Sequence, residues 1–421
     1  MRSFFKLITV TLLAHTAASL PWWPGNDHNG QHPTNYRVDV GVRPYYNINN
    51  MTDGPLKDKL IGCENNKQEI TEFTIGHRGG GTLDFPEETV ESTMAGARMG
   101  AGILECDVSF TKDLGLVCRH SLCDLHTTTN ILLHPDLAEK CVVPFTPANA
   151  TSPANAVCCT TDITTAEYLT LCGKQDGFNA SATNVQDYQY GTPTWRTELY
   201  DTCGTVMTLD SYITLVESLH RNFTPELKTP PSPYVPMPFN GYTQEQYARD
   251  MLDTFIERGI DPSRVYAQSF NPPDIFQWIK EYPDFAKQAI YLDEDGDTPA
   301  TLVNATARLP SLAAKGVKII GPPFGYLLTT TPDNKTIIPS DYAKVAKQAG
   351  LEIIAWTFER SGPLAIVEAT EEYYYTQIAP AIHYDGQMYD VLDILATQIG
   401  IKSIFTDWAA TVTYYANCMG L

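Results

Sequence analysis

Eight short apolar segments alternate with amphipathic stretches between residues 71 and 415, and this alternation constrains the fold more than any other feature. The segments end at Ile75-Gly76, Ile103-Leu104-Glu105, Pro225-Glu226-Leu227, Tyr266-Ala267-Gln268, Ile290-Tyr291-Leu292, Val317-Lys318-Ile319-Ile320, Ile353-Ile354-Ala355-Trp356 and Ser403-Ile404-Phe405-Thr406. Strands that alternate with helices form a parallel sheet, and eight such units favour a closed barrel over an open sheet. We therefore predict an α/β protein with a TIM-type (β/α)8 barrel.

The clearest helix is predicted from Thr243 to Gly259. Thr243 and Gln246 have the spacing of a capping box, and Gly259 is a favourable C-terminal stop. One apolar stripe is formed by Tyr247, Met251, Leu252, Phe255 and Ile256. A stripe of this period is typical of a helix that packs on a sheet.

More than a hundred residues separate the second and third predicted strands, and seven of the ten cysteines lie there. A structureless loop of that length is unusual, so we interpret residues from about 125 to 205 as a cysteine-rich insertion pinned by disulfides over the barrel mouth. The pairing cannot be deduced from spacing. Residues 20–70, rich in Pro, Asn and Gly, are interpreted as an N-terminal extension of the barrel, which we place at residues 71–415.

The first 19 residues have the pattern of a secretory signal peptide, with Arg2 and Lys6 before an apolar run and small residues at Ala17-Ala18-Ser19. The apolar run is too short to span a bilayer, so we expect no stable membrane anchor. The even number of cysteines suits an oxidising compartment. Glycosylation sequons occur at Asn50, Asn149, Asn179, Asn222, Asn304 and Asn334. Together these features predict a secreted glycoprotein.

The formal net charge is -20 at pH 7, from 49 acidic and 29 basic residues. Such a surface repels nucleic acid, so we expect no nucleic-acid partner. It does not exclude a small anionic substrate, because a few basic residues in a cleft can override the global field. The sequence leaves the oligomeric state open.

Two histidines are predicted to lie near one another in space, one after the first strand and one after a hairpin. His77-Arg78 comes directly after the first strand, where catalytic groups of such barrels lie. His120 ends a run that follows Asp107 after only a short turn, which predicts a hairpin that returns over the barrel mouth towards His77. Histidine exchanges protons near neutral pH, and arginine binds phosphate with two hydrogen bonds. Either histidine alone could equally be structural.

Carboxylates alternate along two of the predicted strands. Glu105 and Asp107 should point the same way, into the barrel mouth, with Cys106 facing the helices. Adjacent carboxylates repel unless a cation or a proton neutralises them, and Mg²⁺ or Ca²⁺ prefers such oxygen ligands. Glu226 and Lys228 share one face of the third strand. Glu226 can be a third metal ligand, and Lys228 can contact a phosphate or form a structural salt bridge.

These motifs, in this order, resemble the signature of glycerophosphodiester phosphodiesterases of the secreted, fungal type. The motifs are His77-Arg78-Gly79, Pro86-Glu87-Glu88-Thr89, Glu105-Cys106-Asp107-Val108, Thr111-Lys112-Asp113, His120, Asp162-Ile163-Thr164-Thr165-Ala166-Glu167, Glu226-Leu227-Lys228, Gln268-Ser269-Phe270, Trp356-Thr357-Phe358 and Phe405-Thr406-Asp407. The chain departs from the family pattern at Glu88, Ser121 and Glu359, where the family usually has Asn, Asp and Asn.

The resemblance implies a role for each matching residue. His77 and His120 match the acid/base pair of the family. Its ligands for one divalent cation, Ca²⁺ or Mg²⁺, correspond in this chain to Glu105, Asp107 and Glu226. Arg78 and Lys228 match phosphate-binding cations. The pocket positions match Gln268, Phe270, Trp356 and Phe358, although plain barrel packing is an equally good interpretation of the aromatic residues.

The implied reaction is metal-dependent hydrolysis of a small glycerophosphodiester to glycerol 3-phosphate and an alcohol. Neither the assignment of acid and base nor the choice between water and the glycerol hydroxyl as nucleophile follows from the sequence. One alternative is a lysophospholipase D or sphingomyelinase D-like activity on the same barrel. Another is a non-catalytic cell-wall binding protein, which the intact set of site residues disfavours.

Overall fold

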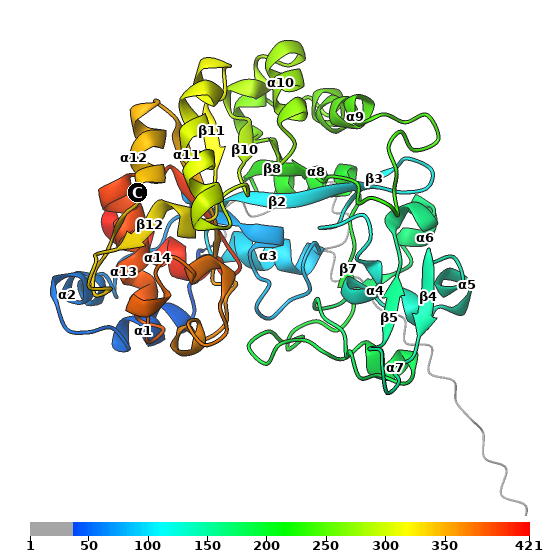
Figure 1. Ribbon diagram of the computed structural model, residues 1–421, viewed down its shortest axis with the longest axis horizontal. Helices are drawn as coiled ribbons and strands as arrows, with labels where there is room; N and C mark the ends of the chain where they lie inside the picture. Colours follow the sequence, from blue (N-terminus) through cyan, green and yellow to red (C-terminus); the bar gives the residue numbers. More distant parts are fainter. Residues whose placement is uncertain (1–36) are drawn as a thin grey trace, which may run out of the picture. The chain divides into compact units, whose positions relative to one another are not determined.

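The barrel of the computed structural model, which describes residues 37–421, is closed by eight parallel strands (Figure 1). The strands are β1 (Thr71–Gly76), β2 (Ala101–Phe110), β8 (Asn222–Leu227), β9 (Gln268–Ser269), β10 (Ile290–Leu292), β11 (Ile319–Gly321), β14 (Glu352–Phe358) and β15 (Ser403–Thr406). Hydrogen bonds run through the order β1-β15-β14-β11-β10-β9-β8-β2, and β2 pairs again with β1. The predicted TIM-type barrel is therefore confirmed. The predicted signal peptide, residues 1–19, lies outside the described residues.

Strand boundaries differ from the prediction mainly at β2. We expected this strand to end near Glu105, but it continues to Phe110. The extension is hydrogen-bonded because β3 (Leu116–Cys118) returns antiparallel along it, with Cys118 opposite Val108. The predicted hairpin after Asp107 is thus present, and it supplies partners for the end of β2 that the neighbouring barrel strands do not reach.

Helices follow most of the strands and cover the outside of the barrel (Figure 1). They are α3 (Val90–Arg98), α8 (Leu209–Ser218), α9 (Gln244–Glu257), α10 (Pro272–Glu281), α11 (Pro299–Ala314), α12 (Asp341–Gln348), α13 (Gln387–Asp393) and α14 (Ala409–Met419). Helix α9 begins after Thr243, whose side chain accepts a hydrogen bond from the backbone N–H of Gln246. Its apolar stripe is buried except for Ile256, which is half exposed.

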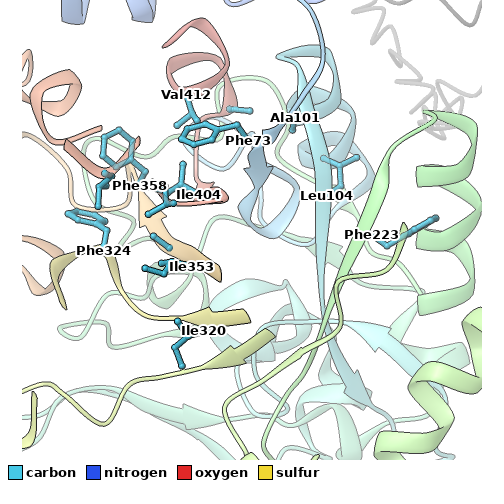
Figure 2. Close-up of a cluster of buried hydrophobic side chains, with 14 of the residues drawn as sticks. Phe73, Ala101, Leu104, Phe223, Ile320, Phe324, Ile353, Phe358, Ile404 and Val412 are labelled. Carbon is cyan, nitrogen blue, oxygen red and sulfur yellow. The ribbon is translucent and has the colours of Figure 1, made fainter. Parts of the chain in front are cut away.

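Apolar side chains form two layers that follow the alternation of the strands. On β1 and β2, Ile75 and Ile103 fill the barrel interior, where they pack with Phe405 of β15. Leu104 and Ile404 point outward into the cluster between strands and helices (Figure 2). Because the interior is filled, the site must lie above it, at the carboxyl ends of the strands.

Residues between β3 and β8 form the cysteine-rich insertion, which has a small core of its own. Its elements are α4 (Leu125–Thr128), α5 (Pro135–Ala138), β4 (Val143–Thr146), β5 (Asn155–Val157), α6 (Thr165–Tyr168), β6 (Cys172–Gly173), α7 (Val185–Tyr188) and β7 (Gly204–Thr205). The core includes Leu125, Ile131, Tyr168 and Tyr188. Three disulfides cross this segment, and they join Cys123 to Cys159, Cys141 to Cys158 and Cys172 to Cys203. Short elements with so small a core depend on such cross-links.

The remaining disulfides tie distant parts of the barrel together. Cys106 on β2 is bonded to Cys118 on β3, and Cys63 to Cys418 in α14, so all ten cysteines are paired. Before β1 the chain forms α1 (Arg43–Asn49) and α2 (Pro55–Gly62), and both contact α14. A separate hairpin, β12 (Leu328–Thr330) with β13 (Ile337–Pro339), lies between β11 and α12. Within residues 37–421, the helices are all too short or too polar to cross a bilayer.

Candidate active site

A cavity of about 450 Å³ opens at the carboxyl ends of the barrel strands. Nine of the predicted site residues line it, and they are His77, Arg78, Glu105, His120, Glu226, Lys228, Gln268, Phe270 and Trp356. Their elements are spread over the chain from β1 to β14, so the barrel brings together residues that are far apart in sequence. Cavities of this size are typical of small-molecule sites.

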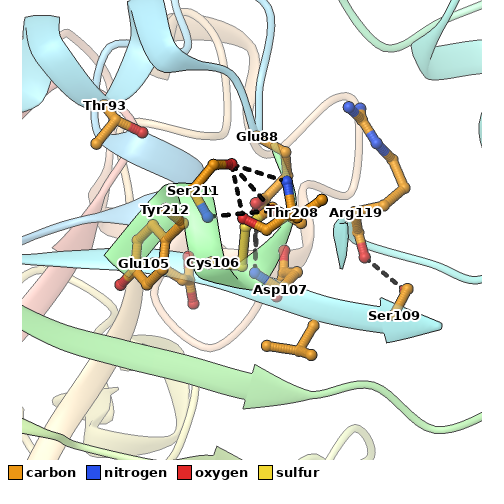
Figure 3. Close-up of a disulfide and its surroundings, with 12 residues drawn as sticks. Glu88, Thr93, Glu105, Cys106, Asp107, Ser109, Arg119, Thr208, Ser211 and Tyr212 are labelled. Carbon is orange, nitrogen blue, oxygen red and sulfur yellow. Dashed lines mark hydrogen bonds between the residues drawn. A yellow bond between two sulfur atoms is a disulfide. The ribbon is translucent and has the colours of Figure 1, made fainter. Parts of the chain in front are cut away.

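Three buried carboxylates meet beside the cavity. Glu105 and Asp107 lie on β2 (Figure 3), and Glu226 lies opposite Asp107 in the register between β2 and β8. One oxygen from each carboxylate lies within 4.8 Å of the others. All three residues are almost fully buried. The strand alternation predicted for Glu105 and Asp107 holds, and Cys106 between them faces the outer cluster.

The ionisation of these carboxylates shows how strongly they repel one another. Burial, followed by the charges of Asp107 and Glu226, raises the pKa of Glu105 well above its usual value. Burial and Asp107 also raise the pKa of Glu226 to about 8, although Lys228 opposes this shift. Burial opposes ionisation of Asp107 as well, but Lys228, His120 and Arg78 outweigh it and lower its pKa. Full ionisation of all three carboxylates would therefore place more negative charge in the cluster than its neighbours neutralise.

This donor set suits a divalent cation. The Oδ2 atom of Asp107 is buried and accepts no hydrogen bond among the described residues, although Nε of Arg78 lies 3.5 Å away. Such an oxygen normally has a partner, and a cation is one that also relieves the mutual repulsion of the carboxylates. Gln268 donates a hydrogen bond from Nε2 to Oε1 of Glu105 (2.7 Å), which fixes the orientation of that carboxylate. Carboxylate oxygens are ligands for Mg²⁺ and Ca²⁺.

His77 begins a short turn after β1 and is held by Asp407, which follows β15. The Nδ1 atom of His77 lies 2.5 Å from Oδ1 of Asp407, and its Nε2 atom lies 3.9 Å from Oε2 of Glu105. Burial lowers the pKa of His77 to about 4, despite the opposing charge of Asp407. A neutral His77 donates its Nδ1 proton to Asp407, which leaves Nε2 as an acceptor on the side of the cavity.

His120 reaches the same cavity from the β2–β3 hairpin. The backbone N–H of Arg119 donates to the carbonyl of Asp107 (2.6 Å), and Oγ of Ser109 donates to the carbonyl of Arg119 (2.8 Å; Figure 3). The Cys106–Cys118 disulfide closes the hairpin. Burial, and then the charges of Arg78 and Lys228, lower the pKa of His120 well below its usual value. The hairpin thus holds a neutral imidazole against the carboxylate cluster.

Two cations flank the carboxylates. Arg78 has a left-handed backbone conformation (φ 50°), and its backbone N–H donates to Oε2 of Glu105 (2.7 Å). Its guanidinium donates to both oxygens of Glu87 (2.9 Å). Lys228 forms an ion pair with Glu226 and lies 3.7 Å from Oδ1 of Asp107. Burial disfavours the charged form of Lys228, but these carboxylates outweigh it and raise its pKa. Both cations line the cavity and stay charged.

Aromatic side chains form the opposite wall of the cavity. Phe270 and Trp356 meet edge to face, with ring centroids 5.6 Å apart. Tyr374 and Phe405 also line the cavity, and they were not among the predicted residues. Glu294, after β10, adds one acidic side chain to this wall. The cavity is therefore charged on the β1–β8 side and mainly aromatic on the β9–β14 side.

The expectation that Phe358 lines the pocket is wrong. Phe358 is fully buried in the outer apolar cluster, where it packs against Phe324 with ring centroids 5.8 Å apart (Figure 2). Simple alternation would place it on the same face as Trp356. The register between β14 and β15 shifts between Ala355 and Phe358, and this irregularity turns Phe358 outward. A local shift of this kind leaves no mark in the alternation of apolar residues.

Three charged residues that contact the site were not among the site residues predicted from the sequence. Asp407 holds His77, and its Oδ2 atom accepts hydrogen bonds from Arg196 and Arg360. Asp407 belongs to the motif Phe405-Thr406-Asp407 at the end of a strand, so its position gave a usable signal. Arg360 follows β14 in the same way. Arg196 lies in the insertion, where no periodicity indicates which residue faces the barrel.

Comparison with known proteins agrees with this geometry. Residues 77–409 match the model of the glycerophosphoryl diester phosphodiesterase family. A protein of Arthroderma benhamiae named "Extracellular protein" is 46% identical over 248 residues, which are 58% of this chain and all of that protein. Glycerophosphodiester phosphodiesterase GDPD6 of Arabidopsis thaliana is 21% identical over 395 residues, 90% of this chain and 93% of that one.

A solved structure shares the fold. The crystal structure of a putative glycerophosphoryl diester phosphodiesterase from Silicibacter pomeroyi superposes with a TM-score of 0.53 and 18% identity. The match covers 86% of this chain and 98% of that one. The family match spans more than three quarters of the sequence and includes every predicted site residue. The chain therefore belongs to the glycerophosphoryl diester phosphodiesterase family and is an enzyme of that class, a phosphoric diester hydrolase.

Proposed function

We propose that this protein hydrolyses small glycerophosphodiesters to glycerol 3-phosphate and a free alcohol by acid–base catalysis with His77 and His120. The observation that carries the proposal is that both imidazoles, the carboxylate cluster and two cations meet around one cavity. A phosphodiester needs charge stabilisation and two proton transfers, and these groups can supply both.

Glu105, Asp107 and Glu226 would hold one divalent cation, Ca²⁺ or Mg²⁺. A cation bound there would withdraw charge from a phosphate oxygen. Gln268 keeps the carboxylate of Glu105 oriented for this task. Arg78 and Lys228 lie beside the same carboxylates and would add positive charge next to the phosphate.

The two histidines would divide the proton transfers. The unprotonated Nε2 atom of a neutral His77 is suited to accept a proton, and the imidazole of His120 lines the same cavity. One, as neutral imidazole, takes the proton of the nucleophile, and the other must enter the step as imidazolium to deliver a proton to the departing alcohol oxygen. The negative charge of a bound phosphodiester would favour that protonated form. The nucleophile is water or the glycerol hydroxyl beside the phosphate.

The aromatic wall would receive the alcohol portion of the substrate. Phe270 and Trp356 offer apolar ring surface, and Gln268 lies at the boundary with the charged wall. A cavity of about 450 Å³ has room for a deacylated diester.

We further propose that the enzyme is secreted. The chain has five disulfides, which persist in oxidising compartments. The signal-like pattern of the first 19 residues agrees with this, as does the name of the Arthroderma relative, "Extracellular protein".

The experiment that tests the proposal is release of glycerol 3-phosphate from glycerophosphocholine by purified protein. The rate is measured untreated, after EDTA, and after Ca²⁺ or Mg²⁺ is added back. We expect EDTA to abolish release and one cation to restore it. Folded protein that releases no product with either cation would contradict the proposed substrate, and lysophosphatidylcholine would be the next compound to assay. Release that EDTA leaves unchanged would contradict the cation site.

A further inference from the structure

A segment of the insertion is fastened to the loop that follows β1. The side-chain amide of Gln175 donates to the carbonyls of Thr82 (2.9 Å), Phe85 (3.0 Å) and Thr197 (2.8 Å). The backbone N–H of Thr197 donates to the carbonyl of Leu83 (2.8 Å). These bonds hold the residues around position 197 against the barrel. The part of the barrel that they contact, residues 82–85, follows His77 in the chain by only a few residues.

The docked segment also touches the loop after β14. The ring of Trp195 lies so close to Gly362 that a Cβ atom there would meet its ring carbon at 2.6 Å. The Cys172–Cys203 disulfide joins the two ends of this segment covalently. Arg196, between Trp195 and Thr197, is thus confined on both sides.

Arg196 directs its guanidinium at the residue that holds His77. It is 7% exposed, and its Nη2 atom forms an ion pair with Oδ2 of Asp407. The other oxygen of Asp407, Oδ1, accepts the hydrogen bond from Nδ1 of His77. The contacts therefore form a continuous chain from the insertion to the imidazole.

Arg360 contacts the same carboxylate but does not replace Arg196. Its Nη1 atom lies 3.0 Å from Oδ2 of Asp407, while its Nη2 atom lies 3.5 Å from Oε2 of Glu87. Arg360 is thus shared between two carboxylates. Among the described residues, Arg196 forms its one ion pair with Asp407.

We propose that the cysteine-rich insertion completes the active site by supplying Arg196 as a positioning residue, which fixes Asp407 and through it the tautomer and orientation of His77. This inference rests on the proposed role of His77. A buried carboxylate that accepts from two guanidinium groups stays ionised and cannot rotate freely. The carboxylate then holds the proton on Nδ1 of His77 and keeps Nε2 turned to the cavity. Residues that orient metal ligands in this indirect way typically change activity about 10- to 100-fold, and we expect an effect of the same size for a residue that orients a histidine.

The first test compares Arg196→Ala and Arg196→Lys with wild type on glycerophosphocholine. We expect kcat to fall about 10- to 100-fold in Arg196→Ala with KM nearly unchanged, because the substrate itself is not contacted. Millimolar guanidinium ion should restore part of the lost kcat, since it can occupy the vacated space beside Asp407. The matched control is Arg249→Ala, which removes a partly exposed arginine of α9 that is paired with Glu281 and lies outside the cavity. It should keep wild-type kcat and show no response to guanidinium.

The second test measures kcat of the Arg196 variants in an Asp407→Asn background. If Arg196 acts through Asp407, Arg196→Lys should cost kcat in the wild-type background and add little in the Asp407→Asn background. Equal losses in both backgrounds, or wild-type kcat in folded Arg196→Ala, would overturn the proposal. This arm also covers the case in which Arg196→Ala does not fold.

A third readout is independent of turnover. In ¹⁵N-histidine-labelled protein, the hydrogen-bonded Nδ1 proton of His77, assigned by its loss in His77→Ala, should shift or vanish in Arg196→Lys and persist in Arg249→Ala. An unchanged signal would overturn the proposed positioning. Wild-type protein that shows this signal but no turnover would instead contradict the proposed function and leave the contact chain intact.

Discussion

The disulfide between Cys106 and Cys118 should matter for activity as well as for stability. Cys106 lies between two of the carboxylate residues on β2, and Cys118 lies two residues before His120. The bond therefore ties β2, which carries two of the proposed cation ligands, to β3, which leads directly to His120. We expect the double variant Cys106→Ala/Cys118→Ala to be less stable and to lose turnover.

The size of the stability loss follows from the length of the closed loop. The two cysteines are 12 residues apart, and closing a loop of that length removes unfolded-chain entropy equivalent to about 3 kcal/mol. Without the bond, β3 keeps its short ladder to β2 and the hydrogen bonds of Arg119 with Asp107 and Ser109. Cys118 also keeps backbone hydrogen bonds with Met207 and with the hydroxyl of Tyr168. These bonds keep the fold of the hairpin but do not cross-link its two strands covalently beside the site. A displacement of about 1 Å at a catalytic group can cost about 100-fold in rate. We therefore expect kcat to fall by about that factor.

The matched control is Cys141→Ala/Cys158→Ala. Its bond closes a loop of 17 residues inside the insertion, so the expected stability loss is also about 3 kcal/mol. Neither cysteine lines the cavity, so turnover should stay near wild type at temperatures where the variant is folded. Urea unfolding would give the stability of each variant, and glycerol 3-phosphate release would give kcat. Equal kcat in both folded variants would refute the positioning of His120 by the disulfide.

Two further predictions concern stability. Burial raises the pKa of Glu372 to about 7 from a usual 4.5, so its neutral form is favoured in the folded protein. The stabilising effect of protonation is complete below pH 4.5 and is lost as the pH rises to about 7. Glu372→Gln should therefore raise the free energy of unfolding at pH 8, by at most about 3 kcal/mol, and change it little at pH 4. An equal effect at both pH values in urea unfolding would contradict this. A Cβ atom on Gly96 of α3 would lie 2.0 Å from the carbonyl oxygen of Gly79, so Gly96→Ala should cost about 1–3 kcal/mol or more. Gly62→Ala in α2, where a Cβ atom meets nothing within 4 Å, should be neutral or stabilising by up to about 1 kcal/mol; similar unfolding midpoints for both variants would refute the steric reasoning.

The sequence indicated the barrel because each strand is an apolar run between turn signals. The strands predicted to end at Leu292 and Thr406 end at those residues in the structure. The end of β2 was misplaced because it is the pairing with β3, a tertiary contact, that extends the strand to Phe110.

Site residues were predictable where strand ends and alternation decide direction. Glu105 and Asp107 face one way because side chains alternate, and Glu226 joins them because β8 is the neighbour of β2. Phe358 was misassigned because the register shift on β14 reverses the alternation locally. The contact of Arg196 with Asp407 depends on how the insertion folds back, and 211 positions separate the two residues.

Disulfide pairing also required the structure. Cys158 and Cys159 are adjacent in the chain but bond to Cys141 and Cys123 respectively. Adjacent side chains on an extended backbone point in opposite directions, so the two sulfur atoms reach different partners. Spacing alone could not have distinguished this pairing from its exchange.

The most direct test of the central claim is the turnover of glycerophosphocholine by His77→Ala and His120→Ala beside wild type, at a saturating concentration of the restoring cation. Each variant should fold, bind the cation, and release glycerol 3-phosphate at least about 100-fold more slowly, because each lacks one partner in proton transfer. Cation binding is measured by equilibrium dialysis and folding by thermal unfolding. A folded, cation-bound variant that keeps near wild-type turnover would remove that histidine from the mechanism and contradict the account.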